Sequence, residues 1–423
     1  RGAGGGGGGG GGRGGRDNKP FRRPNMVRVS NDVARRVRDG HPWVYRDAMQ
    51  GRQLSLAPGK GVDIVDPSGG LCGRALYEPE GTIALRVFAR EPSAELDGAR
   101  VAAVIERAAQ LRRTYVDTSE QACFRAVAGD SEGLPAINVD VYAGHHVVTM
   151  YSGIAEIYLD DVVAALQSTW SPRSIYLQRR HIAPEPGKAR SGAELLAGEA
   201  APAEVIVVEH GVRYVVDVSA PLSVGLFPDM RRGRAAVQKA APGLRVLNCF
   251  SYTGAFSVVA ALAGASTIVS VDTASRAHQR ARRNFSENEI DIEGGGRDVR
   301  FVTGDTFATC ARFASRGEHF DLVILDPPTF SSAKGGRPFT ALKDYAELTQ
   351  AALEIVAPGG LLCAASNAAK LDAVDLERAL ARGGALAKRE LLITDRLSQP
   401  PDFPQTPGFS EASYLKLYLV HVR

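Results

Sequence analysis

The chain has 423 residues, of which 44% are hydrophobic and 23% charged, a composition typical of globular domains. Its net charge is +4, but six basic residues against one acid in the first 25 residues account for all of it. The remainder is about neutral, which excludes nucleic-acid binding through the overall field of the protein. No apolar run reaches the roughly 18 residues of a membrane span, and no signal peptide is evident, so we expect a cytoplasmic protein without membrane contact.

The first 25 residues hold nine consecutive glycines and no apolar periodicity, so we expect a disordered Gly/Arg-rich tail over 1–25. From 26 to 95, short strands such as "GVDIVD", "LCGRALY" and "TIALRVFA" alternate with turns, which predicts a small β-barrel. Trp43 in "GHPWVY" is expected in the core of that barrel, with an RNA-contacting surface position as the alternative.

Residues 96–219 combine helical patterns at 96–115 and 154–167 with two hairpins that turn near Gly144 and Gly211. This pattern predicts a central α+β domain.

The period changes after residue 220. Apolar strands are predicted at 245–250, 267–272, 299–305, 320–326 and 359–367, and helices at 255–263, 274–288, 306–314 and 339–356. Continuous apolar strands separated by helices indicate a parallel sheet covered on both faces, and the final "YLKLYLVHV" is expected to be antiparallel. The fold class is therefore predicted to be α/β.

Polar residues stand at four consecutive strand ends: Asn248, Asp272, Asp305 and Asp326. In open α/β sheets, ligands bind at the carboxyl ends of the strands. Asp272 at the second strand end could accept both hydroxyls of an adenosine ribose, or else cap the helix that follows. The sequence carries neither a P-loop lysine nor a dinucleotide fingerprint, so S-adenosylmethionine is the predicted cofactor.

Two stretches of the sequence could bring the backbone close to such a ligand. In "VLNCFSYTGAFS", a strand breaks into a small-residue loop with Gly254 before a helix, whose free N–H groups could face the ligand. In "FDLVILDPPTF", two prolines force the chain out of the strand directly after Asp326.

These motifs, together with "VSVDTAS", "GLFPDMRRGR", "RDGHPWVY" and "DSEGLPAINVDVY", resemble the RlmI-like family of S-adenosylmethionine-dependent ribosomal RNA large-subunit methyltransferases. The resemblance covers about residues 27–423 and keeps the motifs in order. It implies an N-terminal PUA barrel for RNA at 26–95, the central α+β domain at 96–219, and a Rossmann-like methyltransferase domain at 220–423. Large-subunit ribosomal RNA is the implied partner, and a homodimer is allowed.

The resemblance also implies site residues. Cofactor contacts are expected from Phe227, Arg231, Asn248, Phe250, Ser251, Tyr252, Thr253, Gly254, Asp272, Asp305, Thr306 and Asp326. A catalytic role beside the target base is expected for Asp326, Pro327, Pro328 and Asn367. No metal site is predicted, because the five cysteines are scattered without a C-x-x-C pair.

One departure from the family concerns the target atom. Methylation of cytosine C5 needs a thiolate, and the family carries that cysteine in a Ser-Cys-Ser stretch where this chain has Ser366-Asn367-Ala368. Cys363 lies about 13 Å away along the strand, at about 3.3 Å per residue. "DPPTFSSAK" and the Ser-Asn pair look more like the guanine-N7-methylating half of RlmKL enzymes. Cytosine C5 and guanine N7 both remain alternatives for the methylated atom. A non-catalytic role as an RNA-binding assembly factor is the alternative to enzymatic activity.

Overall fold

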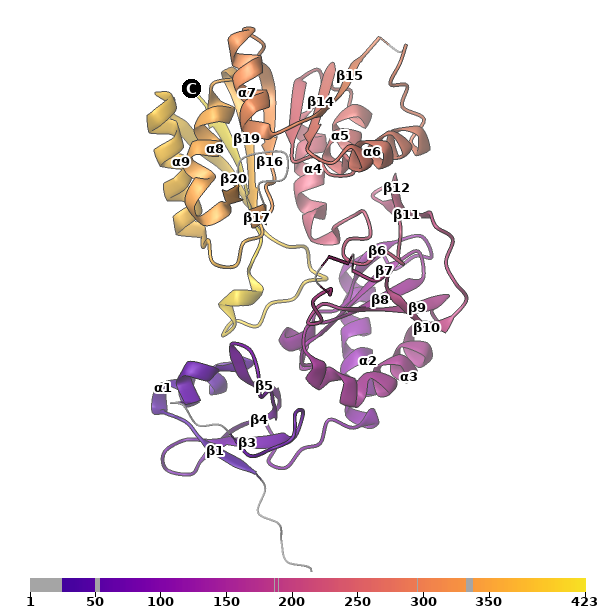
Figure 1. Cartoon of the computed structure of the whole chain (residues 1–423), viewed down its shortest axis with the longest axis vertical. Coiled ribbons are helices and arrows are strands. Elements are labelled where there is room, and N and C mark those ends of the chain that lie inside the picture. The colour runs from indigo at the N-terminus through magenta and orange to yellow at the C-terminus, as the bar shows by residue number, and fades with distance from the viewer. Residues whose placement is uncertain (1–24, 50–53, 186, 189, 295, 332–337) are drawn as a thin grey trace, which may run out of the picture.

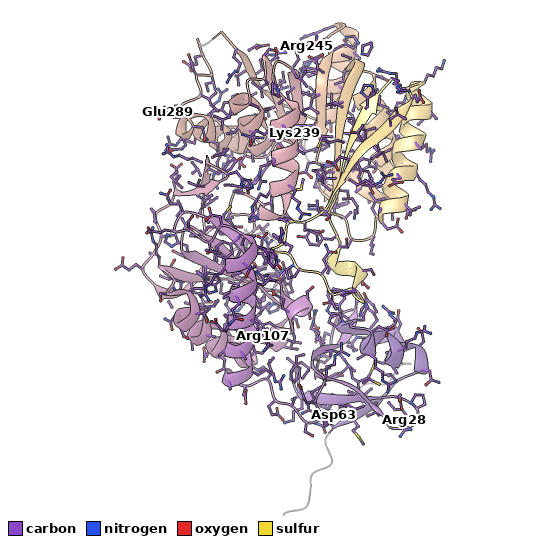
Figure 2. All side chains as sticks on the ribbon, turned by 180° about the vertical axis from the view of Figure 1, so that it is seen from behind. Arg28, Asp63, Arg107, Lys239, Arg245 and Glu289 are labelled. Atoms are coloured by element: carbon purple, nitrogen blue, oxygen red, sulfur yellow. The ribbon has the colours of Figure 1, made fainter. Side chains whose placement is uncertain are left out.

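The computed structural model describes residues 25–49, 54–185, 187–188, 190–294, 296–331 and 338–423. Of the predicted tail over 1–25, all but residue 25 lies outside the described residues. Three units follow one another along the long axis of the molecule (Figure 1). Figure 2 shows the same order from behind, with Arg28 and Asp63 at one end and Arg245 at the other.

The N-terminal unit is a five-stranded sheet in the order β1-β3-β4-β5-β2, in which only the β1–β3 pair is parallel. Its elements are β1 (Met26–Arg28), α1 (Asn31–Arg38), β2 (Trp43–Tyr45), η1 (Arg46–Met49), β3 (Gly61–Val65), β4 (Leu71–Tyr77) and β5 (Ile83–Ala89). Helix α1, which the sequence patterns did not predict, begins at a Ser30 cap and packs its buried Ala34 and Val37 onto the sheet. The unit thereby encloses its own core.

The central unit has a second five-stranded sheet, in the order β10-β9-β8-β7-β6. Its elements are α2 (Gly98–Tyr115), β6 (Cys123–Val127), η2 (Gly129–Glu132), β7 (Ile137–Tyr142), β8 (His145–Met150), η3 (Gly153–Tyr158), α3 (Leu159–Trp170), β9 (Ser174–Arg179) and β10 (Glu194–Gly198). Helices α2 and α3 share one core with one face of this sheet. Cys123, Tyr142 and Tyr176 on the other face join the core of the C-terminal unit.

The hairpin of β11 (Val205–Glu209) and β12 (Val212–Val216) forms as predicted, but it belongs to neither five-stranded sheet. It packs on a helix of the C-terminal unit, where Asn284 Oδ1 accepts a hydrogen bond of 2.7 Å from the backbone N–H of Val215. Buried residues of this hairpin belong to the core of the C-terminal unit. The boundary between the central and C-terminal units is therefore not a single linker.

The C-terminal unit is built on a seven-stranded sheet in the order β15-β14-β13-β16-β19-β21-β20. Its elements are η4 (Pro228–Met230), α4 (Arg231–Ala240), β13 (Arg245–Cys249), α5 (Ala255–Leu262), β14 (Thr267–Asp272), α6 (Ser275–Glu287), β15 (Asp298–Thr303), α7 (Thr306–Ser315), β16 (Phe320–Leu325), β17 (Phe330–Ser331), β18 (Phe339–Thr340), α8 (Ala341–Leu353), β19 (Val356–Ser366), α9 (Ala373–Ala387), β20 (Leu391–Leu397), η5 (Ser410–Ala412) and β21 (Lys416–Val422). Strand β21 is antiparallel to both neighbours, as expected for the final strand.

Along each buried strand, successive side chains point to opposite faces of this sheet. On β13, Val246 packs with α4, α5 and α6, whereas Leu247 and Cys249 pack with α7, α8 and α9. Figure 1 shows these two helix layers on opposite sides of the sheet. The predicted α/β class is confirmed, and burial on both faces leaves the carboxyl ends of the strands as the accessible edge.

The segment between β20 and β21 leaves the sheet and returns to it (Figure 1, yellow). At its tip, Glu411 Oε1 accepts hydrogen bonds from the Tyr45 hydroxyl at 2.6 Å and from His41 Nε2 at 3.1 Å. These contacts dock the C-terminal unit directly on the N-terminal one. Among the described residues, no helix is both long and apolar enough to cross a membrane.

Candidate active site

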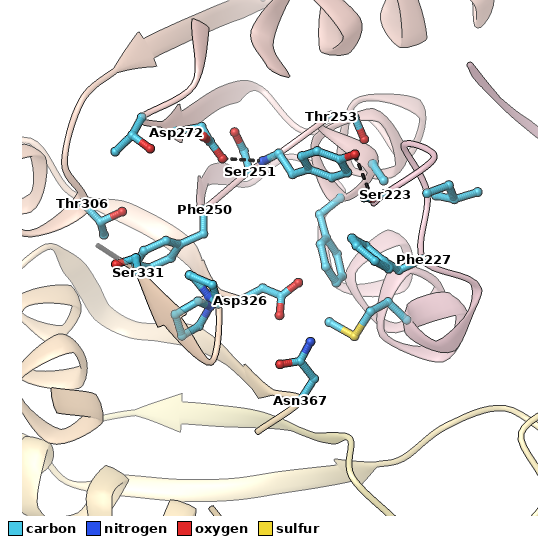
Figure 3. Close-up of a pocket in the computed structure, with 18 of the residues that line it drawn as sticks. Ser223, Phe227, Phe250, Ser251, Thr253, Asp272, Thr306, Asp326, Ser331 and Asn367 are labelled. Atoms are coloured by element: carbon cyan, nitrogen blue, oxygen red, sulfur yellow. Dashed lines mark hydrogen bonds between the residues drawn. The ribbon is translucent and has the colours of Figure 1, made fainter. Parts of the chain in front are cut away.

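A cavity of about 390 Å³, the strand-tip cavity, opens at the carboxyl ends of the parallel strands. Residues that follow β13, β14, β15, β16 and β19 line one side, and residues 223–234 line the other. Figure 3 shows Asp326 pointing from its strand end toward Phe227, with Asn367 beside it. Adjacent parallel strands therefore gather these side chains at one edge, as the sequence predicted.

Most of the predicted site residues line this cavity. They are Phe227, Phe250, Ser251, Tyr252, Thr253, Asp272, Asp305, Thr306, Asp326, Pro327, Pro328 and Asn367. Their individual roles toward cofactor and base remain predictions.

The loop after β13 is held in a strained form by Asp272. Phe250 and Tyr252 have φ of 56° and 47°, in the left-handed region that non-glycine residues rarely adopt. Asp272 Oδ2 accepts a hydrogen bond of 2.8 Å from the Tyr252 N–H, and the Tyr252 hydroxyl donates to Ser223 Oγ at 2.9 Å. Asp272 also accepts from the N–H of Ala274, but Ala274 is the cap residue of α6, so the alternative role of Asp272 as that cap is wrong.

Two residues of the predicted cofactor loop do not line the cavity. Asn248 is buried within the sheet, where its Nδ2 donates to Ser257 Oγ at 2.9 Å. Gly254 has a φ of 73°, and a Cβ there would lie 2.9 Å from the Cβ of Ala281. The close approach that requires this glycine is therefore between α5 and α6, not between backbone and ligand.

The prediction for Arg231 is also wrong, because its side chain lies outside the strand-tip cavity. Its guanidinium binds both carboxylate oxygens of Asp402 at 2.9 and 3.2 Å and donates to the carbonyl of Cys123 at 2.8 Å. Asp402 is itself buried. Arg231 thus joins the central unit to the segment after β20, a contact between residues 171 positions apart that no local pattern signals.

Asp229 is a cavity residue that the sequence analysis missed. Its Oδ2 accepts a hydrogen bond of 2.8 Å from the Tyr414 hydroxyl, while its buried Oδ1 has no hydrogen-bond partner. Burial raises the pKa of this carboxyl above its ordinary value. The signal that could have found it is its place in "GLFPDMRRGR", two residues after the lining residue Phe227.

Among the acids that line the cavity, Asp326 is the one whose pKa departs furthest from its ordinary value. Burial and then the charge of Asp229 raise the pKa of Asp326 to about 7, against a small opposing effect of Arg234. Perturbed carboxyls in a cavity are typical of functional sites, because the surroundings are arranged for a ligand rather than for the acid itself. The two carboxyls together make a strongly polar wall opposite the aromatic side chains.

None of the cavity-lining residues that the structure describes is a cysteine. Cys363 is fully buried inside β19, and burial raises the pKa of its thiol. Cys249 is equally buried, and its contact with Cys310, together with burial, raises the pKa of its thiol as well. Thiols that resist ionisation and lie in the core are inert toward a base in the cavity.

A doubly covered sheet whose acidic strand tips surround a cavity of about 390 Å³ is typical of Rossmann-like domains that bind nucleoside ligands. The unpartnered Ser251 Oγ in its wall adds a free hydrogen-bonding group for such a ligand.

Comparison with known proteins gives the family. Residues 130–420 match the family described as S-adenosylmethionine-dependent methyltransferase, and residues 27–90 match a PUA-like domain. The chain belongs to the S-adenosylmethionine-dependent methyltransferases and is an enzyme that uses this cofactor, with a PUA-like N-terminal domain.

Relatives that match 90% of the chain agree with this assignment and with the predicted resemblance. The ribosomal RNA large subunit methyltransferase I of Cronobacter sakazakii is 30% identical, and that of Escherichia coli 31%; each match covers 90% of this chain and 95% of the relative. The crystal structure of SMU.776 complexed with SAH superposes with a TM-score of 0.85 at 23% identity, covering 94% of this chain and 100% of that one. It shows the same fold.

Proposed function

We propose that the protein methylates a guanine of large-subunit ribosomal RNA at N7, without a covalent bond between enzyme and base. The observation that carries the choice of atom is the cavity wall: Asn367 stands at the end of β19, and every cysteine of the chain is buried in a core. The rival reaction, at cytosine C5, depends on a thiol that reaches the ring.

The chemistry of the two target atoms differs in what the protein must supply. Guanine N7 has a lone pair, so it can form a bond to the methyl carbon directly while the sulfonium leaves as a neutral thioether. No proton is removed from N7, so positioning and exclusion of water are sufficient. Cytosine C5 instead needs a thiolate at C6 and later loss of a proton from C5.

Two of the carboxyls that line the cavity, those of Asp229 and Asp326, support a purine target. Guanine carries N–H donors at N1 and N2 on the edge opposite N7, and a carboxylate can accept both. Asp229 Oδ1, which has no partner, is free for such a bond. Negative charge at this edge also favours the transition state, because methylation leaves a positive charge on the purine.

Ribosomal RNA is proposed as the substrate because relatives that match 90% of the chain are named as large-subunit ribosomal RNA methyltransferases and because a PUA-like domain precedes the catalytic unit. A cytoplasmic location would follow from that substrate.

The test is incubation of unmodified large-subunit ribosomal RNA with the protein and methyl-labelled cofactor, followed by nucleoside mass spectrometry. Labelled 7-methylguanosine is the expected product. Labelled 5-methylcytidine would overturn the choice of atom, and a labelled product only on DNA or transfer RNA would overturn the substrate.

A further inference from the structure

A second cavity, the junction cavity, lies where the three units meet and has a volume of about 340 Å³. Each unit contributes to its wall. Trp43 and Ile83 come from the N-terminal sheet, Tyr151 from the end of β8, and Phe409 from the segment between β20 and β21. Trp43 is only half-buried and lies outside the core cluster of its own sheet, so the predicted core position is wrong.

Aromatic faces dominate this wall. Trp43 and Phe409 meet edge to face with ring centroids 4.6 Å apart, and Tyr151 is 47% exposed. Tyr151 offers a flat ligand an exposed ring, and Trp43, over whose ring the Arg86 guanidinium lies 5.7 Å from the centroid, offers the part of its indole that lines the same cavity. Proteins hold unpaired bases on such rings.

The charged groups of the junction cavity are already paired, which argues against a phosphate site. Arg86 binds Glu78 and Asp130, and Arg125 binds Asp140. A phosphate would have to displace a carboxylate from one of these guanidiniums, whereas a neutral base would not.

Two buried polar atoms of this wall, Asp130 Oδ1 and Trp43 Nε1, have no hydrogen-bond partner within normal distance. They lie close to each other, since the indole N–H of Trp43 opposes the rise in the pKa of Asp130 that burial causes. A base in the junction cavity would therefore meet the aromatic rings rather than these two atoms.

The two cavities adjoin, because a hydrogen bond joins a residue that lines one to a residue that lines the other. Tyr414 lines the junction cavity, and its hydroxyl donates at 2.8 Å to Asp229, which lines the strand-tip cavity. One RNA strand with its target base in the strand-tip cavity would thus pass the junction cavity directly.

We propose that the junction cavity is a second nucleobase subsite, in which an unpaired base of the substrate RNA near the target base stacks on Tyr151 and Trp43. The proposal rests on RNA as the substrate in the proposed function and extends it. It gives the PUA-like domain a defined part in recognition, because Trp43 of that domain would contact a base together with Tyr151 of the central unit.

The test uses Trp43 as its own reporter. The chain has two tryptophans, and Trp170 packs against Phe124 in the central unit, so Trp170→Phe leaves a protein whose emission comes from Trp43 alone. This protein is titrated with a pool of random-sequence decaribonucleotides in saturating S-adenosylhomocysteine, which fills the cofactor part of the other cavity. We expect saturable quenching of Trp43.

Variants then separate stacking from general packing. Tyr151→Ala should weaken decaribonucleotide binding by about 5- to 150-fold, the range for one stacked base, and raise KM rather than lower kcat for methyl transfer to ribosomal RNA. Tyr151→Phe keeps the ring and should bind like the parent. Tyr115→Ala removes a tyrosine that is 63% exposed away from this cavity and is the matched control.

Absence of binding, binding without a change in Trp43 emission, or equal affinity for Tyr151→Ala and Tyr115→Ala would each overturn the proposal. Quenching that Tyr151→Ala weakens supports it even where no 7-methylguanosine forms, so failure of the proposed target is recognised separately by mass spectrometry.

Discussion

Thr329 donates its hydroxyl to Oδ1 of Asn367 across 3.1 Å, which joins the turn after β16 to the end of β19. Because Oδ1 is engaged, the amide NH₂ group is left for the cavity, and Figure 3 shows it on the side of Asp326. Two neighbouring parallel strands thereby present a donor and an acceptor next to each other at their tips.

We expect Asn367→Ala to lower kcat/KM for methyl transfer by about 2- to 12-fold, the effect of losing one neutral hydrogen bond to the base. Thr329→Val, which removes only the support of the amide, should have a smaller effect in the same direction. Steady-state kinetics on ribosomal RNA measures both. An Asn367→Ala protein with parent kinetics would remove Asn367 from the catalytic set.

The raised pKa of Asp326 predicts a pH dependence of activity. With a pKa of about 7, the carboxyl carries the negative charge that makes it a strong acceptor on both oxygens only above that pH, so kcat/KM should rise through pH 7. Asp326→Asn should lose most turnover and retain S-adenosylhomocysteine affinity within a few-fold. A pH–rate profile measures the first effect and calorimetry the second. A parent profile that is flat between pH 6 and 8, roughly one unit either side of that pKa, would contradict the assignment.

Stability should change in the opposite sense with pH. Between an unfolded pKa of 3.8 and a folded pKa of about 7, the folded protein keeps a proton that the unfolded chain has lost, so stability falls as pH rises through this window. Above pH 7 the carboxylate costs at most about 4 kcal/mol, and water in the cavity lowers this. Urea unfolding should show Asp326→Asn more stable than the parent by about 2 to 4 kcal/mol at pH 8, and equally stable below pH 4.

The cavity could be predicted in large part because its acids follow apolar strands. Strand periodicity is local, and parallel strands end at one edge, so placing Asp272 and Asp326 on strand tips also placed them near each other. Helix α9 (Ala373–Ala387) was missed, although Asp372 caps it, because glycines at 383 and 384 weaken its helical pattern.

Residues whose surroundings come from distant segments could not be predicted. Arg231 and Asp402 pair across 171 positions, and Trp43 meets Phe409 from the other end of the chain. Both partners lie in the segment between β20 and β21, which has no regular period to reveal where it packs. The sequence shows which residue types are present but not how deeply they are buried. Burial determines the contacts of both Arg231 and Trp43.

Asp272 should matter for cofactor affinity in two ways. Its carboxylate faces the cavity and also accepts the hydrogen bond that holds Tyr252 in its left-handed conformation. A hydrogen bond to a charged group contributes about 1.5 to 3 kcal/mol, so Asp272→Ala should weaken S-adenosylhomocysteine binding by about ten- to a hundredfold. Tyr252→Phe keeps the loop and loses only the Ser223 contact, and serves as the control. Unchanged affinity in calorimetry would exclude Asp272 from the cofactor site.

A reaction without a covalent step should not need cysteine. Cys249→Ala combined with Cys363→Ala removes the two thiols of the strands that border the cavity, and both are packed in cores. We expect the double variant to unfold at a lower urea concentration but to keep kcat within about threefold of the parent when folded. Loss of methyl transfer from a folded variant that still binds cofactor would show that a thiol takes part.

Arg231 should behave as a structural residue rather than a cofactor ligand. Arg231→Met leaves the buried Asp402 carboxylate without its cation, and breaking a buried pair costs about 3 to 5 kcal/mol. Adding Asp402→Leu removes the stranded charge and should restore part of that stability. Affinity for S-adenosylhomocysteine should stay within about twofold in both variants, because the guanidinium lies outside the strand-tip cavity. Urea unfolding and calorimetry separate the two effects: a tenfold loss of affinity at unchanged stability would return Arg231 to the cofactor site.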